Sequence, residues 1–209
     1  NTMRKLFLLL TCIAGLLAAS GAAQRPTGKN EVVIRNATVM TATDTAIPGG
    51  SGYIGSVYVG SVYIKDGKIV ALGKTVEAPA TATVIEGTGK YLTPGLIDAH
   101  GHLALDEDVN EATSPVVPHM MMVDAFDYDD KAIYRALAGG VTTSMLLHGS
   151  ANMIGGQALV IKHKYGMGRE QMLFAGAPRS IKFASGENPK RVYGGRQQMP
   201  ATRMGNFAV

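Results

Sequence analysis

Hydrophobic positions along residues 30–93 follow the pattern of short β-strands. Residues 32–40 are rich in β-branched side chains, and residues 62–72 hold two apolar runs separated by Asp66-Gly67. Asp-Gly between two apolar runs is typical of a tight hairpin turn, because both residues tolerate positive φ. Residues 83–86 add another short apolar run. The pattern therefore predicts an all-β module over residues 30–93.

From residue 92 onward the pattern alternates between strands and helices. Residues 96–100 predict a buried strand, residues 131–138 a helix, and residues 141–147 a second strand. Asp129 or Asp130 can cap this helix, and Gly139-Gly140 can end it. Strands that alternate with helices of this length are typical of a parallel sheet. Residues 104–128 are then a long loop over the C-terminal end of the first strand.

Composition and charge agree with a globular domain and indicate little more. Hydrophobic residues make up 46% of the chain and charged residues 17%, which is an ordinary balance. The formal net charge of +4 is too small to indicate a nucleic-acid partner or a membrane surface. The basic stretch over residues 182–203 is interpreted as a solvated loop, and His163, between two lysines, as exposed.

The beginning of the chain has the pattern of a secretory signal peptide. Arg4-Lys5 precedes an apolar stretch over residues 6–19, and small residues follow at 20–23. The apolar stretch is shorter than the ~20 residues that a membrane-spanning helix needs. We therefore expect residues 1–23 to be removed, and the mature bacterial protein to be periplasmic or secreted with no membrane association. Cys12, the single cysteine, lies in this segment.

Two histidines at the end of the first α/β strand are the strongest chemical signal. His100 and His102 are separated by one glycine, and alternation along a strand directs both to the same face. Neutral imidazole is the commonest side-chain ligand of zinc and similar metals. The spacing therefore predicts a metal site. Asp98 shares this face, where it could orient a histidine ring or bind neighbouring backbone.

Several motifs in this order resemble the amidohydrolase superfamily, in particular its imidazolonepropionase-like branch as exported from bacteria. The matching stretches are residues 92–103 (LTPGLIDAHGHL), 138–143 (AGGVTT), 149–157 (GSANMIGGQ) and 181–190 (IKFASGENPK). The resemblance implies an N-terminal β-sandwich over residues 30–93, followed by the first part of a (β/α)8 TIM-like barrel over residues 94–209. A complete barrel needs about 250 residues. We therefore expect the chain to be the truncated, N-terminal part of a longer enzyme.

The same resemblance implies a site with one or two divalent cations, zinc before others. His100 and His102 would be ligands, and either Lys182, as a carboxylated lysine, or Glu187 would bridge. The aspartate that acts as general base is expected beyond Val209. His148, Asn152 and Gln157 are candidates for substrate binding, although a glycine-rich turn without chemical duty is the alternative for residues 152–157.

The resemblance implies hydrolysis of an amide or other C–N bond by metal-activated water. The substrate is expected to be small, cyclic or dipeptide-like rather than the backbone of a large protein. Two alternatives stay open: an exported binding protein that has lost catalysis on the same scaffold, and a fragment that is inactive because its barrel does not close. A homo-oligomeric state of the full-length protein is also left open.

Overall fold

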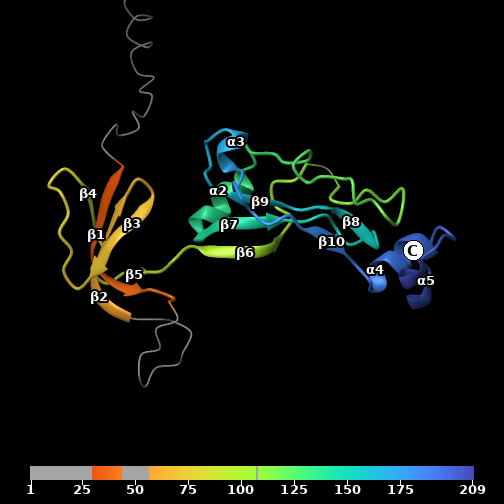
Figure 1. Ribbon diagram of the computed structural model, residues 1–209, viewed down its shortest axis with the longest axis horizontal. Coiled ribbons are helices and arrows are strands. Elements are labelled where there is room, and N and C mark those ends of the chain that lie inside the picture. Colours follow the sequence, from red (N-terminus) through yellow and green to blue (C-terminus); the bar gives the residue numbers. More distant parts are fainter. Residues whose placement is uncertain (1–29, 44–56, 107) are drawn as a thin grey trace, which may run out of the picture. The chain divides into compact units, whose positions relative to one another are not determined.

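The computed structural model describes residues 30–43, 57–106 and 108–209, and the chain divides after Pro94 into two compact units (Figure 1). The predicted signal peptide, residues 1–23, lies outside the described residues. In the part that the structure describes, no helix is long and apolar enough to cross a membrane. The two units are described separately.

The first unit contains one sheet made of its five described strands. These are β1 (Glu31–Met40), β2 (Val57–Lys65), β3 (Lys68–Gly73), β4 (Thr83–Glu86) and β5 (Tyr91–Leu92). The order is β3-β2-β1-β4, and β5 also pairs with β1. β1 runs antiparallel to β2 and parallel to β4 and β5. The second layer of a sandwich stays a prediction.

Alternation along β1 and β2 lets this sheet bury apolar side chains on both faces. Val33 and Tyr63 pack with Ala82 in one cluster, and Val39 and Val62 belong to another. The β2–β3 turn has the expected Asp-Gly geometry, because Asp66 and Gly67 both have positive φ, at 50° and 74°.

The second unit is a mixture of strands and helices. Its elements are β6 (Leu96–Gly101), α2 (Lys131–Ala138), β7 (Val141–Leu146), β8 (Ile154–Gln157), β9 (Leu159–Lys162), α3 (Arg169–Met172), β10 (Ile181–Phe183), α4 (Glu187–Gly194) and α5 (Arg203–Ala208). β6 and β7 are parallel, as the pattern predicts, and β9 joins β7 in antiparallel orientation. β8 pairs with β10 in a separate two-stranded sheet.

Helix α2 packs against this sheet and closes the core of the second unit. Asp130 caps the helix by accepting a hydrogen bond from the Ala132 amide at 2.8 Å. Ile133 is fully buried against Leu146 and Ile161. Because β6 and β7 pair in parallel, the C-terminal ends of both strands lie at the same edge of the sheet.

Four expectations for this unit were wrong. β6 is not a buried strand: Leu96 and Ile97 are 60% and 73% exposed, because β6 lies at the edge of its three-stranded sheet. The basic stretch expected to be a solvated loop contains helix α4, in which Pro189 and Tyr193 are buried. Residues 154–157 form strand β8 rather than a glycine-rich turn, because they pair with β10 and with residues 116–122. His163 is 4% exposed rather than solvated, since its backbone amide bonds the Thr142 carbonyl and brings the ring against the sheet. Lys162 and Lys164, which flank His163, had indicated an exposed position.

Candidate metal centre

The two histidines at the end of β6 lie close together. Their ring centroids are 5.3 Å apart, with the planes at 75°. The His102 Nδ1 atom is 2.8 Å from the Leu147 carbonyl oxygen. A carbonyl can only accept, so Nδ1 carries the hydrogen and the Nε2 lone pair is left for another partner. A backbone carbonyl that fixes the ring and its tautomer in this way is typical of metal-binding histidines.

Asp98 makes a local contact rather than orienting a ring. Its Oδ1 atom accepts a hydrogen bond from the His100 backbone amide at 3.0 Å. Of the two roles that the sequence left open, the structure thus has the backbone one. The contact lies within β6, where the register of the strand with β7 shifts between Asp98 and Gly101.

Lys182 lies beside His100, although the two residues are far apart in the sequence. Its Nζ atom is 3.4 Å from the His100 Nε2 atom. The pairing of β10 with β8 brings Lys182 to this position. The structure therefore groups His100, His102 and Lys182.

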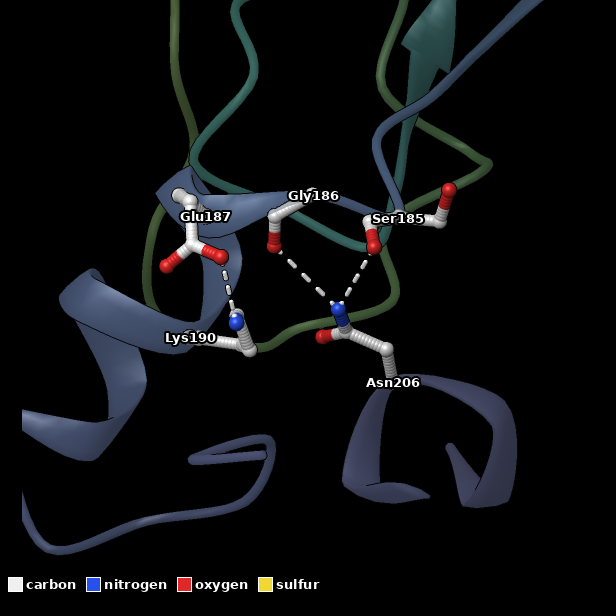
Figure 2. Close-up of polar contacts among 5 residues, drawn as sticks. All are labelled: Ser185, Gly186, Glu187, Lys190 and Asn206. Carbon is white, nitrogen blue, oxygen red and sulfur yellow. Dashed lines mark hydrogen bonds and ion pairs between the residues drawn. The ribbon is translucent and has the colours of Figure 1, made fainter. Parts of the chain in front are cut away.

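Glu187, the alternative bridging residue, has a different environment. Its side chain is 86% exposed, and its carboxylate forms an ion pair of 2.6 Å with Lys190 in the first turn of α4 (Figure 2). Figure 2 also shows that Asn206 of α5 donates hydrogen bonds to the carbonyls of Ser185 and Gly186, at 2.8 and 3.2 Å. The turn between β10 and α4 is held by Asn206, and the Glu187 carboxylate faces its own helix.

The donor set is suited to a divalent metal once the lysine loses its positive charge. An ammonium group beside His100 would repel a cation, whereas a neutral amine or a carbamate would attract it. Among the residues that the structure describes, no group of three or more His, Cys, Asp or Glu side chains is placed to hold a metal. A catalytic zinc site commonly uses three protein ligands, and in the described part of the chain Lys182 is the candidate that lies beside the two histidines.

The three residues predicted to bind substrate all contact the loop over residues 104–128, which we name the covering segment. His148 is 1% exposed; its Nε2 atom accepts from the Glu111 amide, and its Nδ1 atom lies 3.0 Å from the Gly149 carbonyl oxygen. Gln157 donates to the Pro118 carbonyl at 3.1 Å. Direct contact of these side chains with substrate stays a prediction.

Asn152 is more tightly engaged than either of these. It is fully buried, and its amide nitrogen donates to the carbonyls of Glu111 and Ser114. The same nitrogen lies 3.2 Å from the Tyr193 hydroxyl. In this arrangement the amide nitrogen of Asn152 holds the covering segment, and its contact with substrate stays a prediction.

Tyr193 of α4 is a residue that the sequence interpretation missed. It is fully buried, and its hydroxyl donates to the Ser114 carbonyl at 2.7 Å. Burial raises the pKa of this hydroxyl above its ordinary value, so it keeps its proton near neutral pH. Tyr193 stands in a basic stretch that was interpreted as a solvated loop, and no local signal distinguished it.

Comparisons with known proteins agree on one superfamily. No protein-family model matches the chain. Amidohydrolase tasK of Hapsidospora irregularis is 38% identical over an alignment of 146 residues, and the match covers 62% of this chain and 15% of that protein. Imidazolonepropionase of Idiomarina loihiensis is 46% identical over 72 residues, 34% of this chain and 16% of that protein. The chain thus spans about a sixth of the length of these relatives.

A solved structure extends the likeness to the fold. The crystal structure of an amidohydrolase from Thermotoga maritima MSB8 has a TM-score of 0.72 and 42% identity, and the match covers 85% of this chain and 45% of that one. The mixed α/β arrangement therefore matches part of an amidohydrolase fold. Together these relatives support the amidohydrolase superfamily.

Proposed function

We propose that this chain is part of a metal-dependent hydrolase that cleaves an amide or another C–N bond in a small substrate. The observation that carries the proposal is the meeting of His100, His102 and Lys182 from β6 and β10. Relatives named amidohydrolase and imidazolonepropionase support the class of bond. The cyclic or dipeptide-like nature of the substrate, and export with removal of residues 1–23, belong to the same proposal.

The residues of this chain have separate tasks in the proposed site. His102 offers its Nε2 atom, because the Leu147 carbonyl holds the Nδ1 hydrogen. His100 offers its own ring beside Lys182. A bound divalent cation, zinc before others, would lower the pKa of a water molecule toward ~7 and polarise the scissile carbonyl. We propose that the general base is an aspartate that lies beyond Val209 in the full-length enzyme.

One reaction can convert Lys182 from an ammonium group that repels a cation into a metal ligand. Its neutral Nζ atom can add to carbon dioxide; a new N–C bond forms, one proton is released, and the product is a carbamate. This exchanges a positive charge for a negative one next to His100. The geometry favours Lys182 over Glu187 for this position, since the Glu187 carboxylate is exposed and paired with Lys190.

Zinc titration of the purified chain tests the proposal. We expect the His102→Gln and Lys182→Met variants to bind zinc at least about 10-fold more weakly than wild type, which is the scale reached when even indirect contacts of a metal site are lost. Glu187→Gln is the matched control and should bind like wild type. Equal losses for the control and for Lys182→Met would contradict the assignment.

Hydrolysis is tested on dipeptides, N-acetyl amino acids and cyclic imides, with release of the amine or acid as the signal. Cleavage that zinc supports and chelation stops is the expected outcome. If the chain bound zinc stoichiometrically and cleaved none of these compounds, this chain would not carry the proposed activity by itself, and the binding protein or the inactive fragment would be the better description.

A further inference from the structure

The covering segment is seated along β8 by main-chain hydrogen bonds. The Val117 amide donates to the Ile154 carbonyl at 2.8 Å, and the Met122 amide donates to the Gln157 carbonyl at 3.0 Å. β8 in turn pairs with β10, the strand that carries Lys182. The segment is therefore connected through one strand to the candidate metal centre.

Two buried side chains converge on a single carbonyl of this segment. The Ser114 oxygen accepts a hydrogen bond from the Tyr193 hydroxyl at 2.7 Å and another from the Asn152 amide at 2.7 Å. Asn152 follows β7 and Tyr193 lies on α4, so two separate elements hold one point of the loop. Neither side chain is exposed.

Glu111, three residues before Ser114, is held at both its backbone amide and its backbone carbonyl. Its amide donates to His148 Nε2 at 3.0 Å, and its carbonyl accepts from Asn152. Gly155 stands between the His148 ring and Lys182: a Cβ atom there would lie 2.7 Å from His148 Nδ1 and 3.3 Å from Lys182 Cβ. His148, which binds the loop, and Lys182, the proposed metal ligand, thus both pack against Gly155.

The covering segment also forms the wall of a cavity. This cavity has a volume of about 450 Å³, and its lining includes Asp106, Val109, Glu111, Met120 and His148. Cavities of about 300–1,000 Å³ are the size in which proteins bind small molecules. A wall made of loop has a defined shape only where the loop is fixed, and residues 111–114 are fixed by the contacts above.

We propose that Asn152 and Tyr193 are positioning residues that together hold residues 111–114 in one conformation and thereby set how the substrate binds. The role rests on the proposed function, since it concerns the substrate of that site. The side chains act through the loop: their hydrogen bonds hold residues 111–114, of which Glu111 lines the cavity.

Hydrogen–deuterium exchange and kinetics test this proposal on the same variants. Tyr193→Phe keeps the ring and removes the hydroxyl, with its hydrogen bond to the Ser114 carbonyl and the weaker one that it accepts from Asn152. Asn152→Ala removes the donor to both carbonyls. Tyr134→Phe is the matched control, because Tyr134 on α2 is 58% exposed. Loss of one such bond is expected to speed exchange in peptides covering residues 108–118 about 10-fold, the scale of a single net hydrogen bond.

The expected pattern is selective for the loop. Exchange over residues 141–146 of β7 and zinc affinity should stay within about twofold of wild type, on the scale of changes that touch no specific contact. With a dipeptide or N-acetyl amino acid that wild type cleaves, KM should rise more than kcat falls. Tyr193→Phe nearly keeps the side-chain volume. If Asn152→Ala did not fold, exchange and kinetics of Tyr193→Phe alone would test the proposal.

Two outcomes overturn the proposal. Wild-type exchange over residues 108–118 in both variants would show that the loop does not depend on these contacts. Equal acceleration in the loop and in β7 would show a general loss of stability instead of positioning. Failure of the proposed function is seen separately, as a wild-type chain that neither binds zinc nor cleaves the probes; the exchange pattern then still decides whether the two residues hold the loop.

Discussion

Replacing Gly155 by alanine should disturb the loop anchor and the candidate metal centre together. The added Cβ atom would lie 2.7 Å from His148 Nδ1, 3.1 Å from His148 Cγ and 3.3 Å from Lys182 Cβ. The His148 ring is 1% exposed and bonded through both nitrogens. It can therefore yield only by giving up a hydrogen bond.

The size of the effect follows from two contributions. Forcing an extra methyl into a packed site costs about 1–3 kcal/mol. Displacing the ring from the Glu111 amide adds about 1 kcal/mol, the net value of an ordinary hydrogen bond. The free energy of unfolding should thus fall by about 2–4 kcal/mol, which corresponds to a melting temperature lower by roughly 4–16 °C for a chain of this size.

Urea denaturation followed by circular dichroism measures the change, and zinc titration reports on Lys182. Gly139→Ala is the matched control: a Cβ atom there has its nearest neighbour at 3.4 Å, and Gly139 has φ of −81°. The control should stay within about 0.5 kcal/mol of wild type. If Gly155→Ala unfolded at the wild-type urea concentration and bound zinc equally well, the packing argument would be refuted.

Three further substitutions test separate parts of the second unit by urea denaturation. Asp130→Ala removes the cap of α2 and should lower the free energy of unfolding by about 1–2 kcal/mol; an unchanged midpoint would contradict the cap. Asn206→Ala frees the two turn carbonyls that follow β10 (Figure 2) and should cost about 1–3 kcal/mol, whereas no loss would mean that other groups hold the turn. Burial lowers the pKa of His163 below its ordinary 6.5, so the unfolded chain takes up a proton that the native ring resists, and stability should fall as pH drops from 6.5 toward the lowered pKa. His163→Phe should flatten that slope, and an equal slope would refute the assignment.

The elements that sequence pattern predicted are those whose signals are local. The helix over residues 131–138 has the predicted bounds, because Asp130 caps it and Gly139-Gly140 ends it. The strand after it ends one residue before the predicted end. Hydrophobic period, cap and glycine all lie within a few residues of each element, so no long-range contact had to be known.

Elements that depend on distant partners were not found in this way. β8 contains Gly155 and Gly156, which disfavour a strand, and it forms because β10 and the covering segment pair with it. Tyr193 is buried because a loop far back in the sequence presents the Ser114 carbonyl to it. These partners are 79 residues apart along the chain, and a single sequence carries no pattern that connects them.

The same limit explains the positions of His148, Asn152 and Gln157. A polar side chain at the end of a strand beside a long loop can meet either a ligand or the backbone of that loop, and the residue type fits both. Buried backbone groups need partners, and the covering segment presents the amide of Glu111 and the carbonyls of Glu111, Ser114 and Pro118 to these side chains. Backbone partners therefore engage these side chains in the structure, and their direct contact with substrate stays a prediction. Under our proposal, the covering segment also offers Asp106, Glu111 and Met120, which line the cavity, as groups that could distinguish one substrate from another.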